Sequence, residues 1–250
     1  MPTPLSDQVF RLGRSAAARH GAARRTADAF PFGLGRQGVH ELAASAYRDY
    51  PALAGFALAA LGQGPRGALV WITPDLVARD QGRLSAGALH RLQPGLSLLS
   101  IGVRRPEDAL WAAEETVRSG AAGLVVAEVK TVDFTATRRL SLASQRHGVP
   151  LVLLLPQTCE GSTAAQARWR VAARPSAPNR FDPRAPGHTR WQAVLERCRS
   201  APESVGRVFD VEFNDETLSL SLVSGLAARP AATHPPRRDA PEEREWRQSG

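Results

Sequence analysis

The chain has little cysteine, a single lysine and no long apolar run. Only two of its 250 residues are cysteines, Cys159 and Cys198, and they lie far apart and outside any CxxC or histidine-paired spacing. This pattern argues against a disulfide scaffold and against a zinc site. No apolar stretch approaches the roughly 18 residues that a membrane span needs, and no continuous apolar segment follows the N-terminal arginines. We therefore expect a cytoplasmic protein that is neither secreted nor inserted in a membrane.

The positive charge of the chain is almost entirely arginine, because Lys130 is the only lysine. The formal net charge is +8 and the sequence pI is about 10.9. Such a surface attracts nucleic acid or acidic partners. A coding bias that favours arginine, alanine, glycine and proline produces the same composition, so the charge alone leaves DNA contact open.

Composition divides the chain into one folded domain and two terminal segments. With 43% hydrophobic and 22% charged residues, the chain has the make-up of an ordinary globular protein. Residues 1–28 carry five arginines against two acidic residues and are expected to be a basic, flexible or helical segment. Residues 226–250 contain prolines, alternating charges and few apolar side chains, so we expect a disordered tail. The folded domain then spans residues 29–225.

The pattern within this domain changes from alternating strands and helices to strands alone. Strands are predicted at 38–42, 68–72, 96–101, 123–129 and 150–155, with helices at 51–61, 85–92, 105–119 and 134–147 between them. Further strands follow at 167–174, 190–199, 208–213 and 218–223, and the last two form a hairpin. This order predicts an α/β fold, with a mainly parallel sheet flanked by helices and antiparallel strands at its C-terminal end.

That order resembles the ATPase core of RecA-type recombinases over about residues 35–224. Residues 39–42 (VHEL) are similar to the strand that enters the phosphate loop, and residues 123–128 (GLVVAE) to the strand that ends in the Walker B acid. Residues 153–157 (LLLPQ) resemble the strand that ends in a glutamine sensing the γ-phosphate. The strand that begins near residue 167 would then follow a DNA-contacting loop.

Within that superfamily the sequence resembles the ImuA family, RecA-like and SulA-like proteins of bacterial SOS mutagenesis cassettes. The resemblance rests on five motifs in order: 38–42 (GVHEL), 108–115 (DALWAAEE), 124–129 (LVVAEV), 135–143 (TATRRLSLA) and 167–173 (ARWRVAA). It implies a non-catalytic accessory role in error-prone translesion DNA synthesis, part of the response to DNA damage. The implied partners are ImuB, which is a Y-family polymerase-like protein, the error-prone C-family DNA polymerase, and RecA as a further candidate.

The Walker A position of this RecA-like sequence has lost its diagnostic residues. A phosphate loop needs glycines so that backbone N–H groups wrap the phosphates, a lysine to neutralise their charge, and a hydroxyl for magnesium. Here Ala44 and Asp49 replace the glycines, Tyr50 replaces the lysine and Pro51 the hydroxyl residue. Asp49 would place a negative charge beside phosphate oxygens. We therefore predict no cofactor, no ATP hydrolysis and no catalytic residues.

At the Walker B position, Ala127 stands where the metal-associated acid belongs. Glu128 comes one residue after the position of that acid and therefore lies on the opposite face of the strand. Glu128 could line the former nucleotide cleft, or it could be the structural partner of an arginine such as Arg138. Gln157 matches the sensing glutamine but has no γ-phosphate to sense, so we interpret it as a residual loop residue.

Two groups of residues are candidates for contact with partners or nucleic acid. Tyr47, Arg48 and Tyr50 form a polar-aromatic cluster where the glycines would stand, although they could simply cap the following helix. Arg168 and Arg170 flank Trp169, an interleaving of cation and aromatic that can grip single-stranded nucleic acid. The alternative is a strand with Trp169 in the core and both arginines on the solvent-exposed face.

The other conspicuous residues of the sequence indicate structural roles rather than catalysis or metal binding. In the helix at 105–119 we expect Trp111 in the core and Glu114 or Glu115 in solvent. The histidines have no ligand spacing with one another, so no metal site is predicted. Two alternative functions stay open at this point: a SulA-like inhibitor of cell division that binds a cytoskeletal GTPase, and an atypical RecA-like ATPase.

Overall fold

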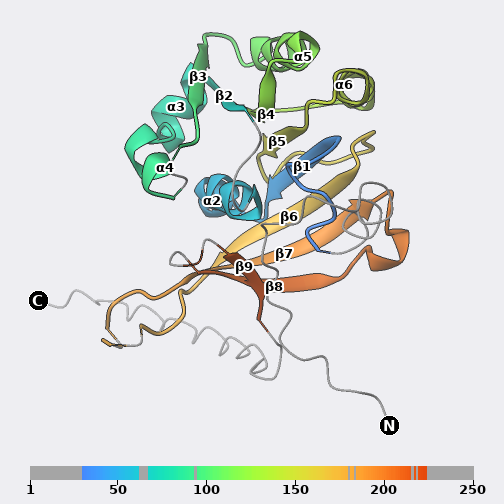
Figure 1. The fold of residues 1–250 in the computed structure, drawn as a ribbon. Coiled ribbons are helices and arrows are strands. Elements are labelled where there is room, and N and C mark those ends of the chain that lie inside the picture. Colours follow the sequence, from blue (N-terminus) through green and yellow to red (C-terminus); the bar gives the residue numbers. More distant parts are fainter. Residues whose placement is uncertain are drawn as a thin grey trace, which may run out of the picture.

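A computed structural model of the chain describes residues 30–61, 67–92, 95–179, 181–182, 184–214, 217 and 219–223 (Figure 1). The terminal segments predicted at 1–28 and 226–250 lie outside the described residues. Within the described part, no helix is both long enough and apolar enough to cross a membrane.

The described residues form one mixed sheet with the strand order β3-β2-β4-β5-β1-β6-β7-β8-β9 (Figure 1). The pairings from β3 to β6 are parallel, and those from β6 to β9 are antiparallel. This arrangement confirms the predicted fold class, including the hairpin of the last two strands. The strands are β1 (Val39–Ala44), β2 (Ala68–Pro74), β3 (Leu98–Val103), β4 (Ala122–Glu128), β5 (Leu151–Leu155), β6 (Ala167–Arg174), β7 (Thr189–Cys198), β8 (Val208–Asn214) and β9 (Ser219–Leu222).

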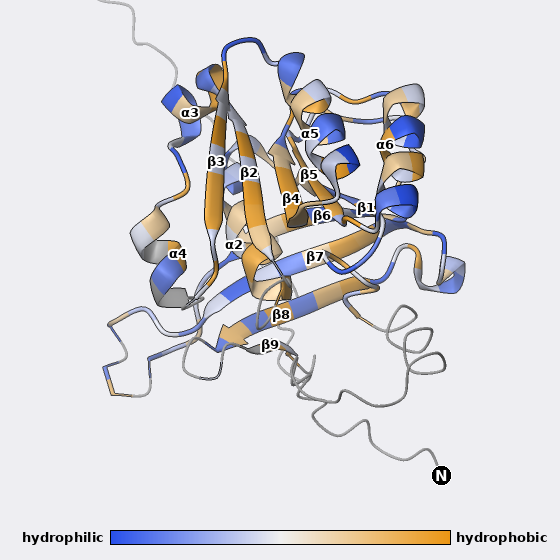
Figure 2. Ribbon diagram, turned by 45° about the horizontal axis from the view of Figure 1, so that its top comes forward, coloured by the Kyte–Doolittle hydropathy of each residue, from blue (hydrophilic) through white to orange (hydrophobic). Residues whose placement is uncertain are grey.

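Helices cover both faces of the sheet. One face packs against α5 and α6, and the other packs against α2, so that each face has its own hydrophobic core. Figure 2 shows the central strands as largely hydrophobic, with hydrophilic turns on the outer sides of α5 and α6. The helices are α2 (Tyr50–Leu61), α3 (Asp75–Gln81), α4 (Ala86–Leu92), α5 (Asp108–Ser119) and α6 (Phe134–His147), with short 3-10 turns η1 (Tyr47–Asp49) and η2 (Pro202–Ser204).

The ends of α5 and α6 follow from local sequence chemistry. Asp133 precedes α6, and its carboxylate accepts a hydrogen bond from the Ala136 amide at 2.6 Å, which satisfies one of the free amides at the helix start. Gly120 after α5 and Gly148 after α6 have φ values of 68° and 70°, which glycine adopts without steric cost. The predicted C-terminal ends of both helices are therefore confirmed, whereas α5 begins at Asp108 rather than at the predicted Arg105.

Trp169 lies at the centre of the core on the α2 face. It is fully buried, and its ring lies 5.7 Å from the rings of Phe30 and Phe32 and 6.3 Å from that of Phe56. Aromatic pairs at these separations add to the energy of area burial. The prediction that Trp169 packs into the core is confirmed.

The prediction for Trp111 is wrong. Its side chain is 65% exposed, and the buried face of α5 consists of Ala109, Ala112, Ala113 and Val117. These small residues let α5 approach the sheet closely, which leaves Trp111 on the outer side. Glu115 is half exposed, as expected for one of the two glutamates, whereas Glu114 is largely covered and paired with Arg139 of α6.

Candidate functional site

The connection from β1 to α2, where a phosphate loop would lie, uses its backbone amides internally. The Ser45 amide donates to the Val171 carbonyl at 2.9 Å, and the Asp49 amide donates to the Ala46 carbonyl at 2.9 Å. The Tyr50 amide donates to the carbonyl of Tyr47. A phosphate site needs such amides free and pointing toward the ligand. These three amides are therefore not available to a phosphate.

Asp49 closes the connection with a negative charge. Its side chain is buried, and its Oδ1 accepts a hydrogen bond from the Ala173 amide of β6 at 3.2 Å. The carboxylate lies directly before α2, where the positive end of the helix dipole would otherwise attract an anion. Pro51 in the first turn of α2 has no N–H to offer. The structure therefore adds a physical reason to the loss of the Walker A residues.

Glu128 is held by three side chains, none of which is an arginine. Its Oε1 accepts hydrogen bonds from Trp71 Nε1 at 2.7 Å and Thr73 Oγ1 at 2.8 Å, and its Oε2 accepts one from the Tyr50 hydroxyl at 3.4 Å. The predicted partnership with Arg138 is wrong, because Arg138 is exposed on α6, whereas Glu128 faces α2. Ala127 belongs to the core of the opposite face, as predicted.

The environment of Glu128 raises the pKa of its carboxyl. Burial raises the pKa of the Glu128 carboxyl, while the hydrogen bonds from Trp71, Thr73 and Tyr50 and the nearby charge of Arg83 oppose this rise. Burial, together with the Glu128 charge, also raises the pKa of the Tyr50 hydroxyl. Glu128 lines a cavity of about 210 Å³, and its place in a former nucleotide cleft stays a prediction.

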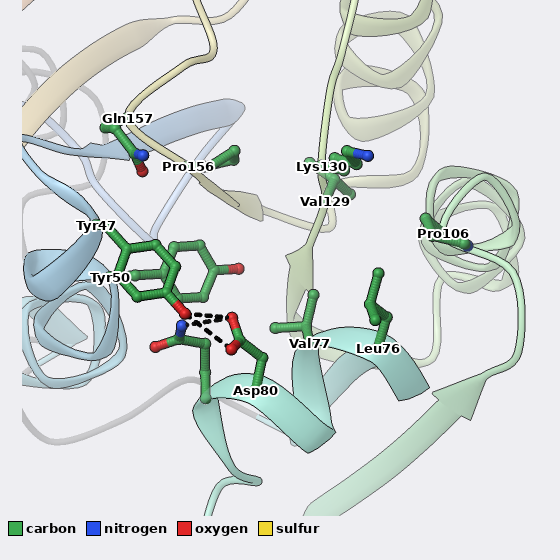
Figure 3. Close-up of a pocket in the computed structure, with 11 residues that line it drawn as sticks. Tyr47, Tyr50, Leu76, Val77, Asp80, Pro106, Val129, Lys130, Pro156 and Gln157 are labelled. Atoms are coloured by element: carbon green, nitrogen blue, oxygen red, sulfur yellow. Dashed lines mark hydrogen bonds between the residues drawn. The ribbon is translucent and has the colours of Figure 1, made fainter.

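A second, mostly apolar pocket opens beside this cluster, at the carboxyl ends of the parallel strands (Figure 3). In open α/β sheets this edge is where ligands usually bind. Its volume is about 140 Å³, and we refer to it as the edge pocket. The residues that line it are Tyr47, Tyr50, Leu76, Val77, Asp80, Gln81, Pro106, Val129, Lys130, Pro156 and Gln157.

Tyr47 is tied to α3 across the mouth of the edge pocket (Figure 3). Its hydroxyl lies 2.8 Å from each Asp80 carboxylate oxygen, and the Gln81 amide donates to Asp80 Oδ2 at 2.8 Å. These bonds from Gln81 and Tyr47 lower the pKa of Asp80, and the same carboxylate raises the pKa of Tyr47. The contact fixes the β1–α2 connection to α3.

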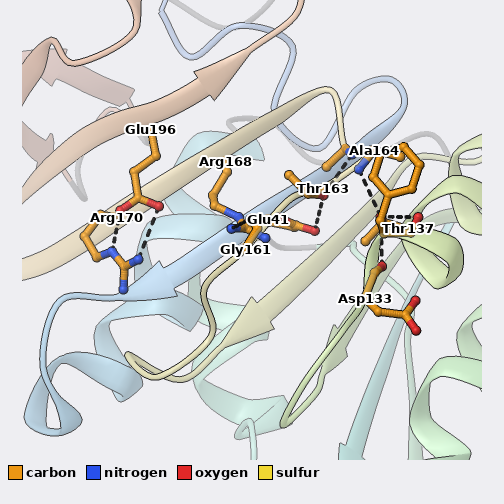
Figure 4. Close-up of polar contacts among 11 residues, drawn as sticks. Glu41, Asp133, Thr137, Gly161, Thr163, Ala164, Arg168, Arg170 and Glu196 are labelled. Carbon is orange, nitrogen blue, oxygen red and sulfur yellow. Dashed lines mark hydrogen bonds and ion pairs between the residues drawn. The ribbon is translucent and has the colours of Figure 1, made fainter.

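Arg168 is an internal residue, which corrects both predictions made for it. Its side chain is 6% exposed, and its Nε lies 2.6 Å from Oε2 of the fully buried Glu41 on neighbouring β1 (Figure 4). The hydroxyl of Thr163 donates to the other oxygen of Glu41 at 2.6 Å, and Arg168 also donates to the Gly161 carbonyl at 2.8 Å. Arg168 therefore lies neither on a solvent-exposed face nor where nucleic acid could reach it.

Arg170 is a partly buried cross-link between strands and loops. Its Nε donates to Glu196 of β7 at 2.6 Å (Figure 4), and its Nη1 donates to the carbonyls of Ala44 at 3.2 Å and Gln157 at 3.1 Å. Together, Arg168 and Arg170 hold the loop between β5 and β6 against the sheet. These bonds occupy the guanidinium of Arg170, so the nucleic-acid contact predicted for it gains no support.

The predicted contact residues of the β1–α2 connection separate into two kinds. Tyr47 and Arg48 are exposed, whereas Tyr50 is buried over Glu128. Contact with a partner stays a prediction for Tyr47 and Arg48, and Tyr50 supports the pocket wall from inside. Sequence reasoning missed Leu76 and Asp80 of α3, although their spacing of four residues places them on one helix face.

The described residues thus form an α/β domain in which a closed, tyrosine-bearing turn joins β1 to α2. They contain no group of three or more His, Cys, Asp or Glu side chains that could hold a metal ion. No family model matches the chain.

The chain is 33% identical over 144 residues to Protein ImuA of Caulobacter vibrioides, in both strain NA1000 / CB15N and strain ATCC 19089 / CIP 103742 / CB 15. The alignment covers 53% of this chain and 56% of the relative, so the chain spans just over half the length of the curated relatives it matches. The crystal structure of SulA from Pseudomonas aeruginosa is 22% identical, with a TM-score of 0.36, over 47% of this chain and 97% of that one. The resemblance to ImuA is confirmed over about half of the chain.

Proposed function

We propose that the protein is a non-catalytic accessory protein of the error-prone translesion DNA synthesis complex, formed in the SOS response to DNA damage. It acts by protein–protein contacts with ImuB and the error-prone C-family DNA polymerase, and RecA is a further candidate partner. The homology to ImuA over about half of the chain supports this assignment.

The observation that carries the non-catalytic part of the proposal is the rebuilt β1–α2 connection. The amides of Ser45, Asp49 and Tyr50 bond to carbonyls within the protein, Asp49 places a carboxylate before α2, and the Tyr50 hydroxyl bonds to Glu128. A phosphate would meet negative charge there and lose the amide cradle that a RecA-type ATPase supplies. An accessory protein that lacks this switch binds its partners equally well with and without nucleotide.

The contact part of the proposal rests on what replaces the nucleotide site. Tyr47 and Leu76 expose 58% and 59% of their surface beside the edge pocket. Exposed aromatic side chains such as Tyr47, beside an apolar pocket, are typical of the energetic centres of protein interfaces. The edge pocket and its rim are therefore the part of the domain where we expect a partner to bind.

The test measures binding of the full chain to immobilised, purified ImuB by interferometry, with and without Mg-ATP. The proposal expects saturable binding with the same dissociation constant in both buffers. The C-family polymerase is then added to the ImuB-bound chain, and a second binding step is expected. Absence of binding to ImuB, or binding that requires ATP, would refute the proposal.

A further inference from the structure

The edge pocket has the size of one side chain rather than of a nucleotide. Its volume is about 140 Å³. Sites for small molecules and cofactors typically measure about 300–1,000 Å³, whereas an apolar cavity of about 150 Å³ holds a molecule of the size of benzene. One aromatic or branched aliphatic side chain therefore matches the volume available.

The walls of the edge pocket are apolar and held in place. Val77, Pro106, Val129 and Pro156 contribute apolar surface around the hollow (Figure 3). The ring of Tyr47 is fixed by the bonds of its hydroxyl to both oxygens of Asp80. A wall that is ordered before binding loses less conformational entropy when a ligand enters. The pocket is thus prepared for an apolar group.

The rim of the edge pocket carries one cation, Lys130, and one carboxylate, Asp80, and only the cation has no polar partner among the described residues. Lys130 is exposed, and no described residue forms an ion pair or a hydrogen bond with its ammonium group. The one carboxylate at the rim, Asp80, already accepts bonds from Tyr47 and Gln81. Complementary charges across an interface favour the correct partner and its orientation. A ligand with a carboxylate near its apolar group is the better match.

We propose that the edge pocket binds a peptide segment of a partner protein that inserts one aromatic or large aliphatic side chain and sets an Asp or Glu carboxylate against Lys130. The inference rests on the proposed function, because it names the kind of segment through which a subunit of the translesion complex binds this chain. The edge pocket then binds one side chain of the partner, and in this role we call it the socket.

Two substitutions at the rim disrupt this socket with little effect on the fold. Leu76→Asp places a charge at the mouth, and Lys130→Glu reverses the charge that attracts the carboxylate. The chain offers matched controls on α6: Leu142 is 58% exposed against 59% for Leu76, and Arg138 is an exposed cation. The control substitutions are Leu142→Asp and Arg138→Glu, and urea unfolding confirms that all four variants are folded.

The pocket is tested by selecting phage-displayed random 12-residue peptides on the full wild-type chain. We expect the enriched peptides to share one aromatic or large aliphatic residue beside an Asp or Glu. As synthetic peptides they should bind Leu76→Asp and Lys130→Glu at least about tenfold more weakly than wild type, and the two controls like wild type. Enriched peptides without this pattern, or equal binding to all five proteins, would overturn the inference.

The same variants separate this inference from the proposed function when their binding to ImuB is measured. If wild type fails to bind ImuB while the selected peptides still require Leu76 and Lys130, the proposed function fails and the socket stands. If ImuB binds wild type and both rim variants equally, and the selected peptides also ignore the rim, the proposed function stands and the socket is refuted.

Discussion

Replacing Arg168 with methionine tests whether this residue stabilises the domain or serves a partner. The substitution removes the cation from a pair in which Glu41 is fully buried and the two charged atoms lie 2.6 Å apart. Of the side-chain donors to Glu41, only Thr163 then remains. Leaving a buried charge without its partner typically costs about 3–5 kcal/mol. We expect a loss of this size in the free energy of unfolding, measured by urea denaturation.

A matched control and a double variant make this result specific. Arg105 also forms an ion pair, with Asp108, but its side chain is 71% exposed, so Arg105→Met should destabilise the fold far less than Arg168→Met. The double variant Glu41→Leu/Arg168→Met removes both charges and should be more stable than Arg168→Met alone. If Arg168→Met costs no more than Arg105→Met, our interpretation of Arg168 as a structural residue is refuted.

Two kinds of further prediction follow from burial. Burial lowers the pKa of His40 from 6.5 to about 4. The stability that the neutral imidazole of His40 contributes is therefore present above pH 6.5 and is lost as the pH falls through 4. This loss in the free energy of unfolding is on the order of 3 kcal/mol. His40→Leu should lack this loss when urea unfolding is compared at pH 7 and pH 4. Burial raises the pKa of Glu128 above its ordinary 4.5, so wild type should lose stability relative to Glu128→Gln as the pH rises from 4.5 to 7. Trp111→Ala should change the free energy of unfolding by less than about 0.5 kcal/mol, whereas Trp169→Ala should cost about 3–5 kcal/mol; equal effects would contradict the assigned exposures.

Much of the fold could be predicted from the sequence, because hydrophobic runs and helix-end glycines are local signals. The strand predictions at 123–129 and 150–155 match β4 and β5 closely, since strands covered on both faces are continuously apolar. The helix α3 was missed because it is short and buries none of its residues, which leaves no apolar periodicity to detect. The orientation of α5 was misjudged because small residues, rather than the large Trp111, face the sheet.

The candidate site was harder to predict, because its contacts join residues far apart in the chain. Glu41 and Arg168 are paired neighbours on β1 and β6, a register that the sequence of either strand does not reveal. The partners of Glu128 likewise come from β2 and α2. The loss of the Walker A residues was readable in the sequence. That Asp49 bonds to β6 and Tyr50 bonds to Glu128 became evident only from the fold.

These contacts describe a domain whose β1–α2 connection is closed by internal bonds and lies beside a small apolar pocket. Asp49 bonds to β6, Tyr50 bonds to Glu128 and Tyr47 bonds to Asp80 of α3, so three side chains of this connection have structural partners. The rigid connection that results is suited to presenting a surface to other proteins.

Calorimetric titration of the purified full chain with Mg-ATP tests the central claim most directly. The β1–α2 connection predicts no heat of binding beyond dilution, because the amides of Ser45, Asp49 and Tyr50 are bonded internally and Asp49 places a carboxylate before α2. A micromolar dissociation constant with one nucleotide per chain would contradict the account and would favour an atypical RecA-like ATPase.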